Sequence, residues 1–528
     1  MIRISESSGA WSAFCDRIVR FLQADTINLV VDGQIVTGFR SPDSPALWIR
    51  DHSDILRGGV FMWEDVKSAV EAFASTQAAN GRVYDFVNVT PLGLPGDREN
   101  WERWVRVPVE ADVEYRFVNA AWLAWQATSD NDWIEHLLPN LEMALRYSMS
   151  HPWRWDRELG LVKRAFTIDT WDFDYTAGRT PWLNFQITDD TFWGIAHGDN
   201  SGLYRAARVL AQLYEQFDYE EKSRHWSSVA DGLRKRANDL LFNGRFYRHF
   251  HKLVPVTIPG VNEEEQLSLS NPMAITRGLA TPQIARAILD EYYRRRQEDD
   301  SFAEWYSISP PFPNGMFGDE KLVEGAYVNG GVMPLVGGEL ARAAFENGRE
   351  AYGLEILEQY RNMIEESGET YLWYFPDGRP STLETSTSPD AMPTDGWGSS
   401  AMLDAFLGGL CGIQDSGSGF KSVRCAPRWI VTGEKRATVR VSYAASRARF
   451  GYSWSHDDDR RKIEIEVDGD ASHVDLHLML PPHALATRVI WGGEERGFSN
   501  HMVDRSRYVD VRGPVSDHVR IVIDYVDG

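Results

Sequence analysis

Paired helical patterns dominate the sequence from about residue 110 to residue 412. The stretch NAAWLAWQA is followed at once by DWIEHLLPNLEMALRYS, and SGLYRAARVLAQLYEQF by HWSSVADGLRKRANDLL; GELARAAFENGREAYGLEILEQYRNMI repeats the arrangement. In the last pair Ile356, Leu357, Tyr360 and Ile364 fall on one face of a helix with 3.6 residues per turn. Each pair has an apolar stripe to bury, which predicts antiparallel helical hairpins.

Long loops rich in Trp, Pro and Gly separate these pairs, notably at residues 151–190 and 373–398. Loops of this length within a compact domain are usually functional. Several hairpins that present such loops on one rim predict an (α/α)6 toroid. The alternative is a generic helical domain, whereas the weak identity between the hairpins argues against a regular solenoid repeat.

The hydrophobic period changes from 3.6 to 2 at about Phe420. RKIEIEVDG, HVDLHLMLP and VRIVIDY alternate apolar with polar residues, which predicts a C-terminal antiparallel β-sandwich. Near the start, INLVVDGQIVTGF carries an Asp-Gly turn between two β-branched runs and predicts a short β-hairpin. We therefore expect a mainly α protein with an N-terminal helix and hairpin (1–60), a catalytic toroid (61–415) and the sandwich (416–528).

Charge and composition limit the partners of the chain. Its 528 residues carry a formal net charge of −22, which disfavours nucleic acid and anionic membranes and suits a neutral or cationic ligand. The cysteines Cys15, Cys411 and Cys425 show no CxxC spacing, the N-terminus lacks a signal-peptide pattern, and no stretch is long and apolar enough to span a membrane. We expect a reduced, cytoplasmic enzyme.

No sequence motif indicates a cofactor or a metal. The chain has neither a Walker A loop nor a dinucleotide glycine fingerprint. Its histidines are scattered, and the rings of His249 and His251 would point to opposite sides of an extended segment, which is poor metal geometry. We expect no cofactor, while the oligomeric state stays open.

The stretch TIDTWDFDY, residues 167–175, concentrates three aspartates beside aromatic rings. Asp172 lies between Trp171 and Phe173, so its ionised form would lose hydration. Burial of this kind raises the pKa of a carboxyl group, as a general acid working near neutral pH requires. The alternative is a loop whose aspartates cap backbone amides.

A second carboxyl group lies in a polar loop. Glu384 precedes the apolar helix that Trp397 opens, and a solvated glutamate could stay ionised and activate a water molecule. One carboxyl group in apolar surroundings and one in water form the acid and base of glycoside hydrolysis. A simple solvated loop residue is the other interpretation of Glu384.

TWDFDY resembles the Trp-Asp-Phe element around the general acid of trehalases and of glycoside hydrolase family 63. Those families also place a base glutamate shortly before a Gly-Trp-small-Ala helix, which Glu384 and DGWGSSA match, and YVNGGVMP is similar to their Asn-Gly turn. The C-terminal sandwich and GGELARAAFENG look like bacterial α-L-rhamnosidases and other six-hairpin glycosidases. The resemblance implies an inverting α-glycosidase with Asp172 as acid and Glu384 as base.

ALWIRDHSDILRGG, residues 46–59, contains a Trp-x-Arg-Asp element that resembles the loop with which glucoamylase-like toroids hold the terminal sugar. Arg50 can donate several hydrogen bonds, Asp51 can accept them from vicinal hydroxyls, and Trp48 offers a flat apolar face. The alternative is an ion pair between Arg50 and Asp51 that fixes a loop.

Further acidic and aromatic residues complete the candidate site. Glu110, Asp112 and Glu114 lead into a helix, where capping is the main alternative, but Asp112 and Glu114 are candidate ligands of sugar hydroxyls. Glu339, at the start of a helix, is the rival of Glu384 as base. The tryptophans expected to stack on sugar are Trp171, Trp373 and Trp397, besides Trp48.

The sequence therefore predicts an exo-acting, inverting glycoside hydrolase that removes an α-linked hexose from an oligosaccharide or a small glycoside. Three alternatives stay open: an α-L-rhamnosidase-like hydrolase, a polysaccharide lyase on a helical toroid, and a carbohydrate-binding protein without catalytic activity. The net charge disfavours the lyase, which usually needs a cationic site for uronates.

Overall fold

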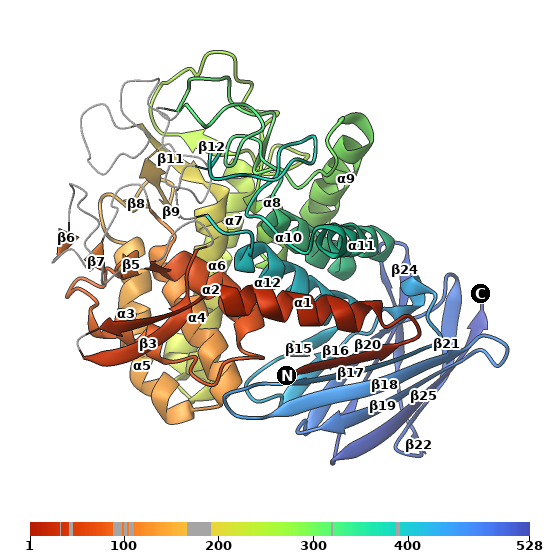
Figure 1. Cartoon of the computed structure of the whole chain (residues 1–528). Helices are drawn as coiled ribbons and strands as arrows, with labels where there is room; N and C mark the ends of the chain where they lie inside the picture. The colour runs from red at the N-terminus through yellow and green to blue at the C-terminus, as the bar shows by residue number, and fades with distance from the viewer. Residues whose placement is uncertain are drawn as a thin grey trace.

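The computed structural model describes residues 1–31, 33–41, 46–87, 98–99, 103–104, 110–165, 192–317, 320–386 and 391–528. The helices and the two large sheets form two adjoining parts of the molecule, and the small strands lie among the helices (Figure 1). No helix in these described ranges is long and apolar enough to cross a membrane.

Six helices of the described chain form a closed ring. Each one contacts the next along the chain, and the last contacts the first. We call them the inner helices: α2 (Ile49–Gly59), α4 (Val113–Thr128), α6 (His197–Gln216), α8 (Ser270–Thr276), α10 (Pro334–Glu346) and α12 (Gly396–Asp404). Small residues let their backbones approach: a Cβ atom on Gly338 of α10 would lie 2.4 Å from the carbonyl carbon of Ala401 in α12.

Six further helices among the described residues pack on the outside of the ring. They are α1 (Ala10–Ala24), α3 (Ser68–Ser75), α5 (Asn131–Ser148), α7 (Glu220–Leu241), α9 (Pro282–Glu298) and α11 (Glu350–Ser367). Local capping explains where several begin: the Asp130 carboxylate accepts from the N–H of Trp133 at the start of α5, and Thr281 caps α9 just before Pro282. Five of the outer helices (α3, α5, α7, α9 and α11) follow an inner helix after a short connection, whereas α1 precedes the first inner helix and packs on the last, α12.

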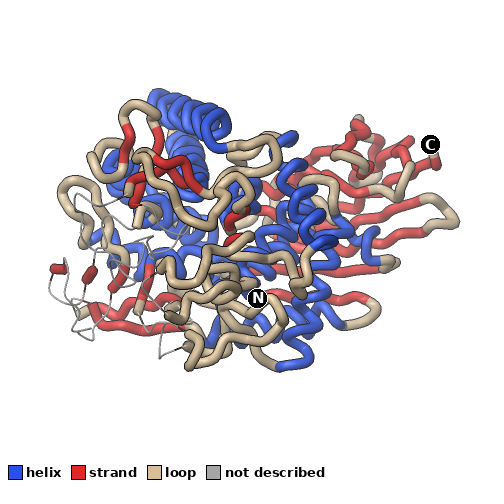
Figure 2. Tube along the Cα trace, turned by 90° about the horizontal axis from the view of Figure 1, so that it is seen from above, coloured by secondary structure: helices blue, strands red, loops and turns tan. Residues whose placement is uncertain are grey.

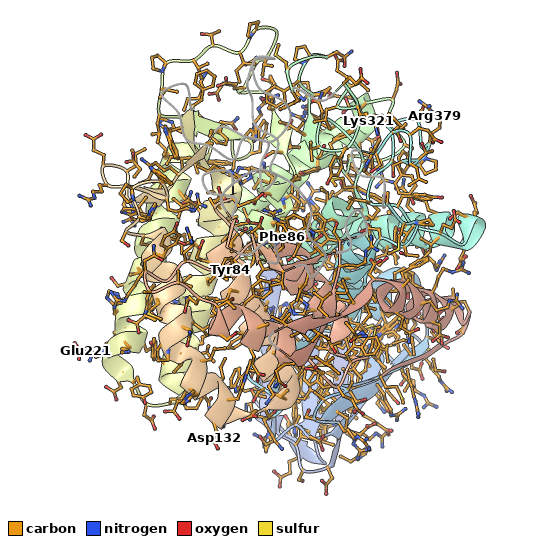
Figure 3. All side chains as sticks on the ribbon, turned by 60° about the vertical axis from the view of Figure 1, so that its left-hand side comes forward. Tyr84, Phe86, Asp132, Glu221, Lys321 and Arg379 are labelled. Carbon is orange, nitrogen blue, oxygen red and sulfur yellow. The ribbon has the colours of Figure 1, made fainter. Side chains whose placement is uncertain are left out.

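The connections at the two ends of the ring differ greatly in length. Those that follow the inner helices are short, at residues 60–67, 129–130, 217–219, 277–281 and 347–349, whereas those that precede them are long, at 25–48, 76–112, 149–196, 242–269, 299–333 and 368–395. Loops face the viewer when the molecule is seen from above (Figure 2). Lys321 and Arg379 mark this loop-bearing end in Figure 3, and Asp132 and Glu221 mark the opposite end.

Two large sheets form the C-terminal part. The first has seven strands in the order β1 (Ile2–Glu6), β17 (Arg436–Ser442), β18 (Arg449–Asp457), β19 (Lys462–Gly469), β25 (His518–Asp527), β21 (Ala484–Trp491) and β22 (Glu494–Glu495). The second has five, in the order β15 (Ile413–Asp415), β16 (Ser422–Cys425), β20 (His473–Met479), β24 (Ser506–Pro514) and β23 (Ser499–Val503). Alternate residues, such as Ile463, Ile465 and Val467, are buried.

Two features of these sheets differ from the sequence expectation. The first strand of the chain, β1, pairs with β17, so Ile4 lies opposite Val439, more than 400 positions away in the sequence. In addition, β16 and β20 are parallel. Both pairings are non-local, and the alternation of residues within a strand does not report which strand it joins.

The expected N-terminal hairpin is present as β2 (Thr26–Val31) and β3 (Gln34–Phe39). The remaining sheets are small and lie in the segments that precede the inner helices. They contain β4 (Leu47–Trp48), β5 (Phe86–Val87), β6 (Arg98–Glu99) and β7 (Arg103–Trp104); β8 (Trp155–Asp156) and β9 (Leu161–Val162); β10 (Arg164–Ala165), β11 (Trp193–Ala196) and β12 (Phe250–Lys252); and β13 (Leu267–Ser268) and β14 (Ile308–Ser309).

Polar contacts fasten the sandwich to the ring. Glu350, the first residue of α11, accepts hydrogen bonds from the Tyr508 hydroxyl and, at 2.6 Å, from the Ser506 hydroxyl. The Tyr452 hydroxyl donates to the carbonyl of Cys411 at 2.7 Å. The division of the chain at residues 60 and 415 stays a prediction; α1 and α2 pack into the ring, and β1 into the sandwich.

Replacing Gly338 with alanine should destabilise the fold, because the new methyl group would overlap the backbone of α12. We expect the free energy of unfolding to fall by about 1–3 kcal/mol, as is typical of overpacking. Gly497→Ala is the matched control, since a Cβ atom there meets nothing within 4 Å. Urea denaturation of both variants measures the difference, and equal stabilities would contradict the close approach of α10 and α12.

Candidate active site

Charged side chains gather at the N-terminal ends of the inner helices, the end that bears the long connections. We call this set the polar cluster; its members are Arg50, Asp51, Asp54, Glu110, Asp112, Glu114, Arg116, Arg164 and Asp199. All of them are at least nine-tenths buried. Burying this many ionisable groups is unfavourable unless they are paired, so such clusters are candidates for functional sites.

The pair of Arg50 and Asp112 joins the starts of α2 and α4. Arg50 Nε lies 2.7 Å from Asp112 Oδ2, and Nη2 lies 2.8 Å from Oδ1, which is a two-pronged contact. Arg50 also forms an ion pair with Glu110. Burial alone would raise the pKa of Asp112, but the charge and hydrogen bonds of Arg50 outweigh it and lower that pKa well below its usual range.

Arg116 extends the network toward α12. Its Nη1 binds Asp54 Oδ1 at 2.5 Å, and its Nε lies 3.3 Å from Asp112 Oδ2. The other oxygen of Asp54 accepts from the indole N–H of Trp397 at 2.7 Å. Burial opposes ionisation of Asp54, but the charges of Arg116, Arg57 and Arg277 lower its pKa. Three inner helices are thus connected through two buried carboxylates.

Two carboxyl groups of the cluster hold their protons more tightly. Burial raises the pKa of Asp51 to about 6, against the opposing charge of Arg50. Burial also raises the pKa of Glu114 to about 7, although Arg154 opposes it. The hydroxyl of Ser148 and the N–H of Val83 lie 3.5 and 3.4 Å from the Glu114 carboxyl oxygens. Near neutral pH, the cluster therefore combines fully ionised carboxyl groups with partly protonated ones.

A separate ion pair lies at the start of α6. Arg164, in β10, binds Asp199 with 3.3 Å between Nη1 and Oδ1, and both side chains are fully buried. Asn200 fixes the adjacent chain, because it accepts from the N–H of Val162 at 2.9 Å and donates to the carbonyl of the same residue at 3.0 Å. The start of α6 is therefore tied to β9 and β10.

The aromatic and charged residues predicted around the sugar have diverse environments. Trp48 is half-buried, and its ring centroid lies 4.1 Å from that of Phe86. Trp373 and Trp397 are almost fully buried, at 1% and 2% exposure. Arg50 forms ion pairs with Glu110 and Asp112. The alternative interpretation, an ion pair between Arg50 and Asp51, is not the observed pairing.

The capping interpretation of the acids before α4 is not the observed arrangement. Asp112 occupies the N-cap position, but its side chain makes no capping hydrogen bond and binds Arg50 and Arg116 instead. Glu114 lies in the first turn of α4 and is 2% exposed. Both are inward-facing members of the polar cluster.

The described residues include both predicted bases, Glu384 and Glu339. Asp172 and Trp171 lie outside the described residues. Glu384 is exposed, and a hydrogen bond from Thr382 lowers its pKa, so it is ionised at neutral pH. Glu339 lies within the ring, where Arg57 Nη1 and the Thr276 hydroxyl each donate to it at 2.6 Å. The pairing of Asp172 with Glu384 stays a prediction.

Sequence reasoning missed Asp54, Arg116, Arg164 and Asp199. Asp54 could have been found, because it lies one helical turn after Arg50 and therefore on the same face. Arg116 follows Asp112 by four residues in the same way. Arg164 and Asp199 meet only through the pairing of β10 with β11, for which no local pattern exists. No group of three or more potential metal ligands occurs among the residues with described positions.

Replacing Glu114 with glutamine should flatten the pH dependence of stability. A pKa raised from its ordinary value to about 7 stabilises the folded state at low pH, and that stability is lost as the pH rises through 7. We expect Glu114→Gln to gain stability over the wild type at pH 8, on the order of 1–3 kcal/mol, and little at pH 5.

Urea denaturation at both pH values tests this expectation. The exposed Glu366→Gln is the matched control and should follow the wild type. Burial also raises the pKa values of Asp25 and Asp51, to about 7 and 6. The stability of the Glu114 variant should therefore still fall with rising pH, but less steeply than that of the wild type. An equal loss of stability from pH 5 to pH 8 in both proteins would mean that Glu114 is not protonated in the fold.

Comparisons with known proteins identify the fold. No protein-family model matches the sequence, and no characterised protein matches it by sequence. An α-L-rhamnosidase structure from Dictyoglumus thermophilum has a TM-score of 0.61 at 12% identity, covering 99% of this chain and 50% of that protein. A glycoside hydrolase family 78 rhamnosidase from Bacillus sp. GL1 has a TM-score of 0.58 at 15% identity, covering 90% and 42%.

A glycoside hydrolase family 63 mannosylglycerate hydrolase from Thermus thermophilus has a TM-score of 0.51 at 17% identity, covering 75% of this chain and 99% of that one. The chain therefore spans half or less of the two rhamnosidase structures, but nearly the whole of the family 63 structure. The expected relation to six-hairpin glycosidases is confirmed at the level of the fold.

Proposed function

We propose that the chain is a glycoside hydrolase and that its closed ring is the (α/α)6 toroid of the six-hairpin glycosidases. The polar cluster is the observation that carries this proposal. It lies at the end of the ring that bears the long connections, and its ionisable groups have strongly perturbed pKa values. A fold alone does not establish an activity, whereas a buried cluster with mixed protonation provides groups that can act on a substrate.

The reaction proposed in detail is the inverting, exo-acting hydrolysis of an α-linked hexose. Asp172 protonates the glycosidic oxygen, and Glu384 removes a proton from water on the opposite face of the sugar. This chemistry needs carboxyl groups about 6.5–9.5 Å apart. Support for Glu384 comes from its exposure and lowered pKa, since a general base must be ionised. The role of Asp172 rests on its sequence surroundings.

Sugar recognition is assigned to the start of α2 and its neighbours. Asp112 holds the Arg50 guanidinium in a fixed orientation, which suits a donor to sugar hydroxyls. Asp51, whose pKa is about 6, can donate or accept. Glu114 and Trp48 lie beside them and would complete the contacts, with an oligosaccharide or a small neutral glycoside as the substrate. A cytoplasmic location is part of the same proposal.

An α-L-rhamnosidase is the second candidate. The observation that favours it is the coverage of the structural match, which includes 99% of this chain, sandwich included, for the Dictyoglumus thermophilum rhamnosidase. The family 63 structure matches over 75%. Rhamnose and glucose differ in their hydroxyl orientations and in the methyl group of rhamnose, so a substrate panel separates the two candidates.

A panel of aryl α- and β-glycosides, including α-glucoside, α-mannoside and α-L-rhamnoside, tests the function. We expect release of the aglycone from an α-hexoside, with the β-anomer of the sugar appearing first in proton NMR spectra. Initial release of the α-anomer would replace inversion by a double displacement. Products with new ultraviolet absorbance would indicate a lyase, and binding without turnover a carbohydrate-binding protein.

Replacement of either proposed catalytic carboxyl group should abolish most of the activity. We expect Asp172→Asn and Glu384→Gln to lower kcat by about 10²–10⁴-fold, the usual contribution of general acid or base catalysis. The control is Glu320→Gln, another exposed carboxylate in a connection at the loop-bearing end. Unchanged kcat in Glu384→Gln would transfer the role of base to another residue, with Glu339 as the first to test.

A further inference from the structure

The ring encloses a cavity of about 420 Å³ toward the C-terminal ends of the inner helices. Each inner helix or the residue next to it contributes to its wall, for example through Tyr115, Arg205, Arg277, Glu339 and Leu403. Residues 413–416 and the rings of Phe420 and Tyr443 cover it from the side of the sandwich. The wall also includes Asp54 and Arg116, so the cavity extends from the polar cluster toward the end opposite to the long connections.

Several buried donors on the wall have no acceptor within the described part of the chain. Nη2 of Arg57, Nη2 of Arg116 and the hydroxyl of Tyr115 are buried atoms without a hydrogen-bond partner there. Tyr115 is 5% exposed, and the Arg116 side chain is 2% exposed. Leaving such buried groups without an acceptor is unfavourable, and more so for charged groups. A ligand in the cavity that accepts hydrogen bonds would satisfy these donors.

The wall carries five arginines and five acidic residues, but the pairing between them is uneven. Arg205 forms no hydrogen bond or ion pair with any residue whose position is described. Burial lowers the pKa of its guanidinium, and Arg208 adds to this effect. Arg277 donates to the carbonyl of Gly198 at 3.1 Å and to the Ser201 hydroxyl at 2.9 Å, but these are neutral acceptors.

The carboxylates around the cavity are already engaged. Glu339 binds Arg57, and Asp54 binds Arg116. Glu346 and Asp404 both bind Arg342, at 3.0 and 3.3 Å, and Asp415 accepts from two backbone N–H groups and from the Tyr443 hydroxyl. Because these acids have partners of their own, they leave Arg205 and Arg277 without a directly bound counter-ion among the described residues.

Aromatic packing fixes two of the arginines in place. The guanidinium carbons of Arg116 and Arg277 lie 5.2 and 5.3 Å from the centroid of the same Tyr115 ring. Gly202 on α6 makes room for that ring, since a Cβ atom there would lie 2.2 Å from Tyr115 Cζ. The donors are therefore held by a rigid wall, as a preorganised binding site requires.

We propose that this cavity binds a small organic anion, whose carboxylate or phosphate group accepts hydrogen bonds from Arg116, Arg205 and the Tyr115 hydroxyl. Its volume falls in the range of small-molecule sites and exceeds what an inorganic ion needs, so an uncharged body can lie against Phe61, Trp122 and Tyr443. Gln212 and Ser416, which line the cavity and are exposed, mark its opening to solvent between α6 and β15.

The overall charge of −22 means that unspecific attraction cannot explain the binding of an anion. A strongly acidic chain repels anions in general, so binding must come from the local arginines rather than from the average field. Arg116 belongs to the polar cluster as well, but the test variants change Arg205, Arg208 and Tyr115, which lie outside it, so anion binding is measured separately from hydrolysis.

Isothermal titration calorimetry on the full chain, with inorganic phosphate and with malonate at constant ionic strength, tests the site. We expect saturable binding of at least one of them. Arg205→Gln should weaken it by about tenfold or more, the loss of one charge-assisted hydrogen bond. The matched control is Arg208→Gln, on the same helix and outside the cavity, which should stay within about twofold of the wild type.

Tyr115→Phe provides a second variant that removes only the hydroxyl group, and it should also weaken binding. Phosphate without malonate binding, or the reverse, identifies which oxyanion the donors select. Absence of binding by both anions, equal weakening by Arg205→Gln and Arg208→Gln, or binding of neutral glucose in place of the anions would each overturn the proposal. Hydrolase activity can be present or absent in every one of these outcomes.

Discussion

Buried ion pairs along the axis of the ring are the interaction on which the rest of the structure depends. Asp112 binds the two arginines Arg50 and Arg116, and Asp54 links Arg116 to the indole of Trp397. Removing charges from water is expensive, and a buried ion pair is favourable only when its hydrogen bonds are complete. The network therefore requires α2, α4 and α12 to meet at one place and in one orientation.

The two ends of the ring differ in what surrounds this network. At the end of the inner-helix N-termini, the connections are long. At the other end, short turns and the sandwich close the ring, and arginine side chains remain inside it. Arg116 belongs to both regions, because it binds Asp54 and Asp112 while its remaining nitrogen lines the cavity.

The carboxyl groups of the polar cluster differ in their pKa values. Asp112 has a lowered pKa because arginines surround it, whereas burial with weaker compensation raises the pKa of Asp51 and Glu114. Two aspartates at the starts of neighbouring helices, Asp51 in α2 and Asp112 before α4, thus have pKa values shifted in opposite directions. Sequence identities of 12–17% to the matched structures leave the ring and sandwich recognisable while most side chains differ. A shared fold does not by itself define an activity, which is why the proposed function rests on the side chains of the polar cluster.

Local patterns in the sequence determined the helical pairs, the Asp-Gly hairpin and the strands after residue 420, because hydrophobic period, caps and turns act over a few neighbouring residues. They also singled out Arg50, Asp51, Asp112 and Glu114. They did not determine the partner of Arg50, the meeting of Arg164 with Asp199, or the addition of β1 to the C-terminal sheet.

Those features join residues far apart in the chain. They exist only once the ring has closed, when burial removes water and leaves each charge to find the counter-charge that the packing provides. The inward arginines of the cavity follow the same rule: the sequence shows them as ordinary residues of helices, and only the tertiary structure decides that Arg205 faces an enclosed space with no described carboxylate bound to it.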